Sequence, residues 1–116
     1  MIEIKVKGGK RHERFITRSV VSWCKEHFRL NSDFAINIRL EKYIDCWGYC
    51  TEGKVEHSYN IKIATDQTLR DFIATLVHEM IHVKQYATGK WKGTGEQEAS
   101  NLQYKLTDKM WKEGIL

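Results

Sequence analysis

The strongest helical pattern in the sequence surrounds the pentapeptide HEMIH at positions 78–82. Thr68, followed by Asp71 three residues later, is typical of a capped helix start, and Gly89 is typical of a helix end. Residues four apart lie one above the other on a helix, so both imidazoles should leave the same face. The pattern therefore predicts a long helix that carries a histidine pair and buries an apolar stripe. The stripe consists of Leu69, Phe72, Ile73, Leu76, Val77 and Met80.

Two imidazoles on one helix face are suited to a single Zn²⁺ ion, which binds histidine nitrogens at about 2.0–2.1 Å. Glu79 is turned by about 100° from His78. It is therefore poorly placed as an equivalent third ligand but near enough to reach a water held by the metal, which is the position of a general base. Apolar residues flank the motif, so these polar groups would be costly to bury without a cation. A half-buried histidine pair without metal is the alternative.

A catalytic zinc site needs a third protein ligand and one open position. No histidine follows His82 and every cysteine precedes it, so the third ligand should be a carboxylate on the last predicted helix. The candidates are Glu96, Glu98 and Asp108. The apolar stripe of that helix lies about 75° from Glu96 and about 85° from Glu98, so periodicity does not choose. Two features favour Glu96: the helix dipole stabilises an anion in the first turn, and the small Ala99 one turn later would let the two helices approach closely.

The whole chain predicts a single α+β domain over residues 1–116. A chain of 116 residues has the length of one domain, and 41% apolar residues are enough for a core. Two aromatic and β-branched runs flank a turn in which Gly53 should take a positive φ angle. This indicates an antiparallel hairpin and hence a small antiparallel sheet. The expected elements are strands at 2–6, 34–40, 43–50 and 55–63 and helices at 13–30, 69–88 and 96–113.

The sequence resembles HExxH zincins of the gluzincin type. Positions 75–86, TLVHEMIHVKQY, are similar to the motif helix of small SprT-like metallopeptidases of bacteria and phages, and the similarity covers roughly residues 43–104. It implies a minimal zincin fold with an N-terminal helix, a small antiparallel sheet, the HExxH helix and a C-terminal ligand helix. Gluzincins often place their third ligand in a Glu-x-x-Ala setting, which positions 96–99 fit. The resemblance thus implies a zinc peptidase with metal ligands His78, His82 and Glu96 and with Glu79 as catalytic base.

Charge and composition set expectations for partners and location. The net charge of +4 is mild and mixed in sign, with short basic runs at 5–11 and 90–92, so nucleic acid is a weakly supported partner beside a protein or peptide substrate. The resemblance also implies an association with DNA-linked protein substrates. No segment approaches the roughly 18–20 apolar residues of a membrane span. Three cysteines and no signal-like start favour a reducing, cytoplasmic location.

Three functions compete at this point. The leading hypothesis is a zinc metallopeptidase. The second is a non-catalytic zinc-binding zincin scaffold that serves as a protein or nucleic-acid interaction module, which the intact Glu79 disfavours. The third is a zinc hydrolase of a non-peptide amide. An accessible edge strand beside the site would favour the peptidase, and a closed pocket would favour a small-molecule substrate.

Other polar side chains are candidates for supporting roles. Candidate donors to a developing oxyanion are His57, Tyr59 and Tyr104. Candidate hydrogen-bond partners of the two imidazoles are Thr75, Asp71 and Gln85. Each of these side chains could instead have a purely structural role.

Overall fold

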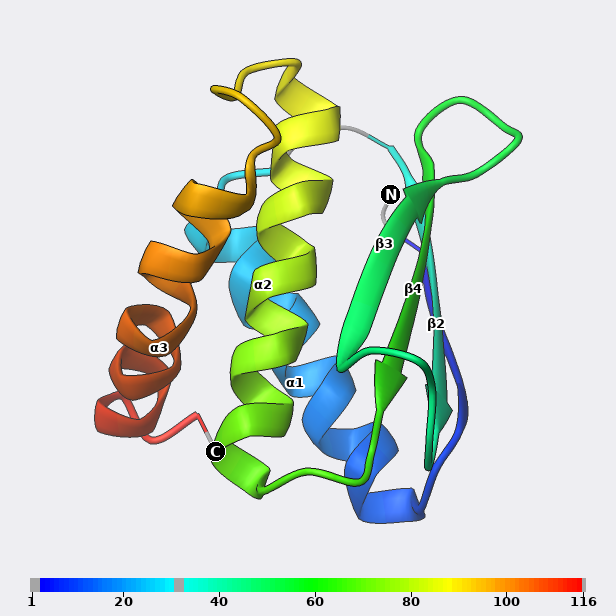
Figure 1. The fold of residues 1–116 in the computed structure, drawn as a ribbon, viewed down its shortest axis with the longest axis vertical. Helices are drawn as coiled ribbons and strands as arrows, with labels where there is room; N and C mark the ends of the chain where they lie inside the picture. The colour runs from blue at the N-terminus through cyan, green and yellow to red at the C-terminus, as the bar shows by residue number, and fades with distance from the viewer. Residues whose placement is uncertain (1–2, 31–32, 116) are drawn as a thin grey trace.

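Four strands form one sheet and three helices lie on one of its faces in the computed structural model, which describes residues 3–30 and 33–115 (Figure 1). The α+β class expected from the sequence is confirmed. Ile2, the expected start of the first strand, lies outside the described residues. The elements are β1 Glu3–Gly8, α1 Arg11–His27, β2 Ala35–Glu41, β3 Gly48–Glu52, β4 Ser58–Ala64, α2 Leu69–Thr88 and α3 Glu96–Lys112.

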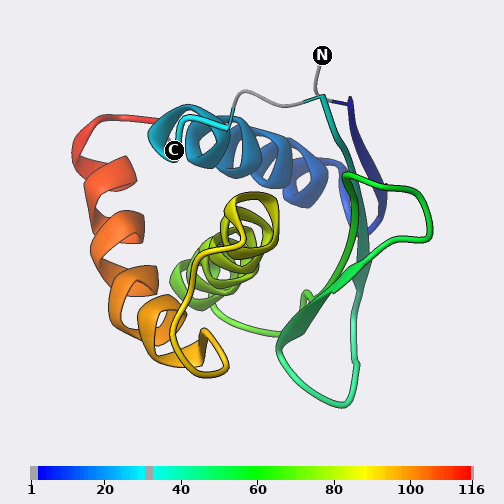
Figure 2. The ribbon, with the colours of Figure 1, turned by 90° about the horizontal axis from the view of Figure 1, so that it is seen from above.

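The helices lie in two layers beside the sheet (Figure 2). In the first layer, α1 packs against β1, and α2 packs against β3 and β4. In the second layer, α3 packs against the side of α2 that faces away from the sheet. The helix that carries the histidine pair is therefore at the centre of the molecule, between the sheet and the last helix.

The sheet is mixed, which corrects the expectation of an antiparallel sheet. Its strand order is β1-β2-β4-β3, and only β3 and β4 run antiparallel. Helix α1 returns the chain between β1 and β2, so those two strands point the same way. Because β3 occupies the outer side of β4, β4 is left free to pair in parallel with β2. Alternating hydrophobicity identifies the buried face of a strand but not its partners, and so could not predict this arrangement.

The hairpin between β3 and β4 forms as expected, but its turn differs from the prediction. The positive φ angle belongs to His57, at 60°, and Gly53 is not among the residues with positive φ. Glycine is needed at position 53 for space, because a Cβ atom there would overlap the side chain of Ser58. The strand β3 also begins at Gly48 and not at Tyr43, which leaves the exposed side chains of Tyr43 and Trp47 in the preceding loop.

Helix α2 is built as its sequence pattern predicts. The hydroxyl oxygen of Thr68 accepts a hydrogen bond from the backbone N–H of Asp71 at 3.2 Å, and Gly89 ends the helix with a φ angle of 67°. The predicted stripe is buried except for its first residue, Leu69, which is exposed. Burial on two sides holds the helix rigidly, so side chains on its remaining face keep fixed directions. The buried members of the stripe are Phe72, Ile73, Leu76, Val77 and Met80.

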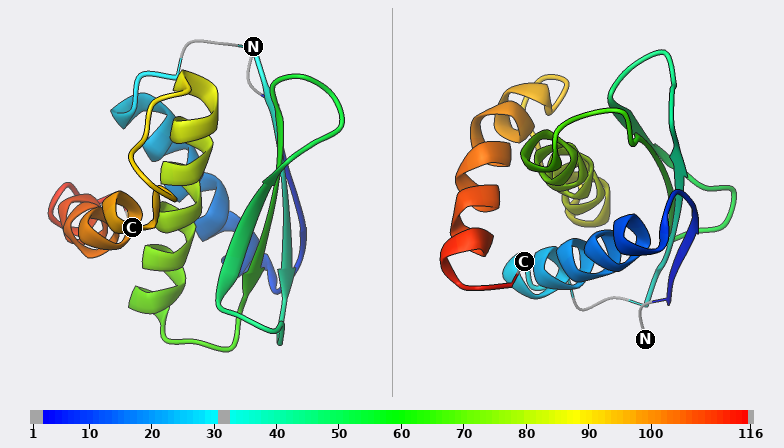
Figure 3. Two further views of the ribbon diagram at one scale, coloured as in Figure 1. Left: turned by 45° about the horizontal axis from the view of Figure 1, so that its top comes forward. Right: turned by 90° about the horizontal axis from the view of Figure 1, so that it is seen from below.

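The second face of the sheet is not covered by any described helix (Figure 3). Side chains on the covered face are apolar and buried, such as Ile36 and Ile38 of β2 and Ile61 and Ile63 of β4. Side chains on the uncovered face are polar or charged. Within residues 3–30 and 33–115, no helix is both long enough and apolar enough to cross a lipid bilayer.

Candidate metal centre

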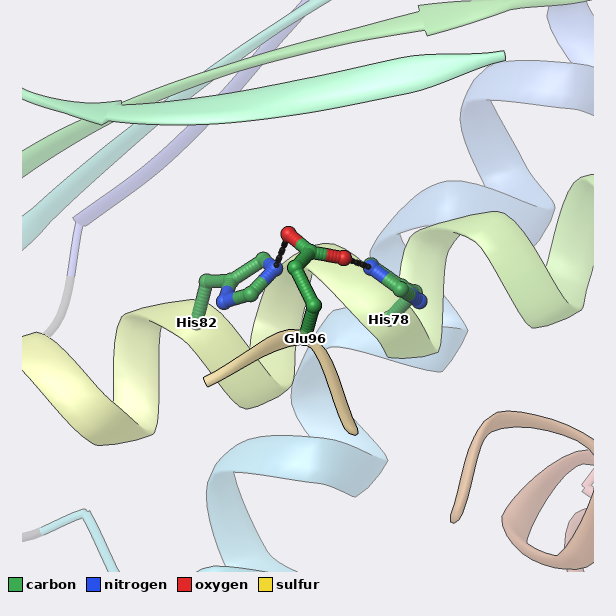
Figure 4. A group of neighbouring side chains, drawn as sticks. All are labelled: His78, His82 and Glu96. Carbon is green, nitrogen blue, oxygen red and sulfur yellow. Dashed lines mark hydrogen bonds and ion pairs between the residues drawn. The ribbon is translucent and has the colours of Figure 1, made fainter. Parts of the chain in front are cut away.

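Two histidines of α2 and one carboxylate of α3 meet at a single point (Figure 4). The Nε2 atom of His78 lies 2.9 Å from one carboxylate oxygen of Glu96, and the Nε2 atom of His82 lies 2.8 Å from the other. One donor atom from each residue lies within 4.8 Å of the others, which is close enough for one metal ion. These are the three residues that the sequence assigned to zinc.

The two other candidate carboxylates point elsewhere. Glu98 accepts hydrogen bonds of 2.8 Å from both Lys84 and Gln85, and these bonds, chiefly that from Gln85, lower its pKa. Asp108 forms an ion pair of 3.3 Å with Arg70, which lies in the first turn of α2 and away from the two histidines. The choice between Glu96 and Glu98, which helical periodicity leaves open, therefore falls on Glu96.

The loop between α2 and α3 determines where Glu96 lies. Gly89, Gly93 and Gly95 all have positive φ angles, so the loop turns sharply and brings the start of α3 back onto α2. Position 95 also requires glycine because of space, since a Cβ atom there would overlap the side-chain amide of Gln85. The hydroxyl of Thr94 then accepts a bond of 3.3 Å from the backbone N–H of Glu96. A glycine-rich loop thus places a carboxylate on the first residue of α3.

Two glutamine side chains orient the imidazoles from behind. The Oε1 atom of Gln85 lies 2.8 Å from Nδ1 of His82, and the Oε1 atom of Gln103 lies 2.6 Å from Nδ1 of His78. The Gln85 amide has one possible orientation, because its nitrogen donates to the carbonyl of Gly95 at 3.0 Å and to Glu98 at 2.8 Å. Its oxygen must then accept from His82, which places the imidazole proton on Nδ1.

This orientation makes the site suitable for a cation. A neutral imidazole with its proton on Nδ1 keeps a lone pair on Nε2, and in His82 that lone pair faces Glu96 at 2.8 Å. Two hydrogen-bond acceptors repel at that distance unless a proton or a metal ion lies between them. Two imidazole nitrogens and one carboxylate oxygen are a common donor set of catalytic zinc sites. The residues present therefore fit a zinc ion.

Glu79 lies beside this group and is a buried residue, with 4% of its surface exposed. It makes no hydrogen bond with any described residue. Burial raises the pKa of Glu79 from 4.5 to about 7, an effect that His78 and His82 partly oppose. The side chain can therefore exchange a proton near neutral pH, as a general base and acid must.

Two cavities flank the site on either side of Gly48. One has a volume of about 210 Å³ and is lined by all three metal candidates and by Tyr86 and Thr94, among others. The other, of about 200 Å³, reaches from Glu79 to Trp47 and Gln103. The three candidate oxyanion donors line neither cavity: Tyr59 is buried behind Tyr86, the hydroxyl of Tyr104 donates to Asp71 at 2.6 Å, and His57 lies in the hairpin loop.

Sequence reasoning found one imidazole partner and missed two residues whose spacing places them on the same helix faces as the metal candidates. Gln85 contacts an imidazole as expected, whereas Thr75 bonds to the backbone oxygen of Asp71 and to Gln67. Gln103 stands seven residues after Glu96, which returns it to nearly the same helix face. Tyr86 follows His82 by four residues and so extends the histidine face of α2. Both spacings were available in the sequence.

The chain matches no known protein family, no curated protein and no solved structure. The resemblance of positions 75–86 to SprT-like peptidases therefore stays a prediction from the sequence.

We expect Gln85→Leu to weaken zinc binding by about 10- to 100-fold, because His82 would lose the acceptor that keeps its proton on Nδ1. Titration of the metal-free protein against a competing zinc chelator measures this change. Gln67→Leu is the matched control, since Gln67 also bonds to α2 through Thr75 but touches neither imidazole. Equal affinities of the Gln85 and Gln67 variants would contradict the orienting role.

Proposed function

We propose that the protein is a zinc-dependent metallopeptidase that hydrolyses peptide bonds. In this proposal His78, His82 and Glu96 hold the metal and Glu79 is the catalytic base. The observation that carries it is the juxtaposition of two oriented Nε2 atoms, one shared carboxylate and a buried glutamate with no hydrogen bond to any described residue. A site that only held zinc for structure would have no need of that glutamate.

A bound zinc ion would supply Lewis acidity, which polarises a carbonyl group and makes water easier to deprotonate. Glu79 would accept the proton of the attacking water and later deliver it to the leaving amine. Its raised pKa suits both steps, because the group can hold a proton near neutral pH and release it again. Gln85 and Gln103 would keep the histidines fixed while the proton moves.

A peptide substrate has a natural place beside β3. This strand is at the edge of the sheet, and residues 48–50 line the cavity that contains the metal candidates. Gly48 lies close to α2, since a Cβ atom there would come within 2.8 Å of Thr75. An extended peptide could pair with the free edge of β3 and pass directly over Glu79. This accessible edge favours a peptide over a small enclosed molecule.

We also place the activity in the cytoplasm. Cys24, Cys46 and Cys50 are all free thiols, and free cysteines are usual in proteins of reducing compartments. Cys24 is fully buried and Cys50 is half-buried beside the metal candidates. The fold therefore rests on no disulfide between these cysteines.

Zinc content should depend on Glu96 and not on Glu98. We expect about one zinc per chain in wild-type protein after loading and dialysis, and clearly less in Glu96→Ala, which leaves two protein ligands. Glu98→Ala should retain zinc, because that carboxylate faces Lys84 and Gln85. Elemental analysis of the three proteins measures this. Loss of zinc in Glu98→Ala alone would move the third ligand to Glu98.

The peptidase activity is tested with zinc-loaded protein and an unfolded protein substrate. Cleavage should stop when a chelator is added and return when zinc is restored. Full zinc occupancy with no cleavage of a broad peptide library would favour the non-catalytic scaffold. Cleavage that persists in a chelator would remove the proposed mechanism.

A further inference from the structure

The helices leave one face of the sheet uncovered (Figure 3), and the strand register places a row of cations on that face. In the strand register, Lys7 of β1 lies beside Arg39 of β2, and Lys62 of β4 comes next. Tyr49 of β3 ends the row, with the ammonium group of Lys62 5.8 Å from the centre of its ring. Neighbouring strands are about 4.8 Å apart, so this basic row crosses the entire sheet in roughly 15 Å.

A second row, two residues along each strand, is polar. Asn37 and Asn60 stand opposite each other on the two central strands, with Lys5 on one side and Thr51 on the other. Strands disfavour asparagine, so two facing asparagines at the centre of a sheet do little for its stability. The amide nitrogen of Asn37 donates a long hydrogen bond of 3.5 Å to the side-chain oxygen of Asn60, and the remaining amide donors and acceptors of this exposed pair can bond to a ligand.

A shallow groove of about 440 Å³ runs over both rows. Its lining contains four cations and no carboxylate among the described residues. The two glutamates of this face do not line the groove: Glu3 pairs with Lys5 at 3.2 Å, and Glu41 pairs with Lys62 at 3.5 Å and with Arg39 at 4.0 Å. The groove is therefore complementary to an anionic chain and not to an apolar or cationic one.

We propose that this groove binds single-stranded nucleic acid. The cations of the basic row contact successive phosphates, Tyr49 stacks on a base, and the amides of Asn37 and Asn60 contact base edges. A single strand fits because its bases are free to stack and to present their edges, as on other nucleic-acid-binding sheets. The bases of a duplex would be hidden from Tyr49.

This binding does not depend on the proposed peptidase. The side chains that form the two rows of the groove belong to the uncovered face of the sheet. The metal candidates belong to α2 and α3, which lie on the other side of the sheet (Figures 2 and 3). Lys7, Arg39 and Lys62 line neither cavity of the metal site, whereas Tyr49 lines the groove and also the cavity that contains the metal candidates. The test therefore uses the whole 116-residue chain with a chelator present, so that the result does not depend on whether the metal site holds zinc.

The experiment measures fluorescence anisotropy of a labelled oligodeoxythymidylate of about 15 nucleotides, titrated at several salt concentrations. The double variant Lys7→Ala/Arg39→Ala should bind at least about tenfold more weakly, and its salt slope should fall by about 1.4, or 0.7 for each lost phosphate contact. The double variant Lys90→Ala/Lys92→Ala makes the same charge change in the loop after α2. It should bind like wild type, which separates a local groove from the effect of net charge.

The stacking part of the proposal is tested at Tyr49. Tyr49→Ala should weaken binding by about fivefold or more with little change in salt slope. Tyr43→Ala is the matched control, because Tyr43 is also exposed but lies in the loop before β3. Far-ultraviolet circular dichroism of each variant verifies that the fold is intact.

Four results would overturn the proposal. They are no binding of wild type at low salt, equal weakening by the two double variants, equal effects of the Tyr49 and Tyr43 substitutions, and tighter binding of duplex DNA or of polyglutamate than of the single strand. The last result would assign the groove to a double helix or to an acidic protein instead.

Discussion

Glu79→Gln should lower the rate of peptide hydrolysis by about 10²- to 10⁴-fold while the protein keeps its zinc. Glutamine has nearly the shape of glutamate but cannot accept the proton of the attacking water. The ligands His78, His82 and Glu96 are untouched by the change. This result would assign Glu79 to the chemistry and separate its role from metal binding. It is measured as turnover of an unfolded protein substrate beside zinc content.

The stability of the same variant serves as its control. Burial raises the pKa of Glu79 to about 7, so above that pH the folded wild type contains an ionised group that burial disfavours. This destabilisation grows as the pH rises from about 4.5 to about 7 in metal-free protein. Metal-free Glu79→Gln should therefore unfold at no lower temperature than wild type at about pH 8. Undiminished hydrolysis by a folded variant would refute the assignment of the base.

His82→Ala should abolish the stabilisation of the fold by zinc. A ligand present at about a thousand times its dissociation constant stabilises a protein by about 4 kcal/mol, which for a domain of this size is a rise in Tm of about 15 °C. Wild type should show this rise on addition of zinc, and His82→Ala should show little of it. Thermal unfolding with and without zinc measures the difference, and His78→Ala should behave alike.

The matched control for the histidine variants is His12→Ala. His12 is exposed on α1 and is not part of the metal candidates, so its removal should leave the zinc-induced rise unchanged. A zinc-induced rise that survives in both His78→Ala and His82→Ala would place the metal elsewhere. If the wild-type protein shows no zinc-induced rise in Tm and contains no zinc, the motif is only a histidine pair that is hydrogen-bonded to Glu96.

Local signals predicted the central helix and the pairing of its two histidines on one face. Thr68 and Gly89 mark the ends of α2 because capping is a property of a few neighbouring residues. The spacing of four placed His78 and His82 on one face for the same reason. Glu96 could be assigned from the sequence only with the help of a family resemblance. In the structure two features distinguish the two carboxylates: the loop glycines place Glu96 beside the histidines, and Gln85 donates a hydrogen bond to Glu98.

Features that depend on distant segments could not be read in the same way. The period of two in β1 and β2 predicts which side chains are buried, but the parallel pairing of these strands follows from the return path through α1. The contact between Gln103 and His78 joins two helices whose packing angle no local pattern contains. The hairpin turn likewise brings Ser58 against Gly53, a contact across the turn that no single position of the sequence indicates.

The division of the site between two helices has a kinetic consequence. Two ligands belong to the central helix α2, while Glu96 is the first residue of α3, the helix farthest from the sheet. An ion held at this point would join the outer layer to the inner one, and movement of the start of α3 would remove one of its three protein ligands. A chelator should then extract zinc faster when the loop at 89–95 opens more often. The rate of zinc release would then report how often the start of α3 separates from α2.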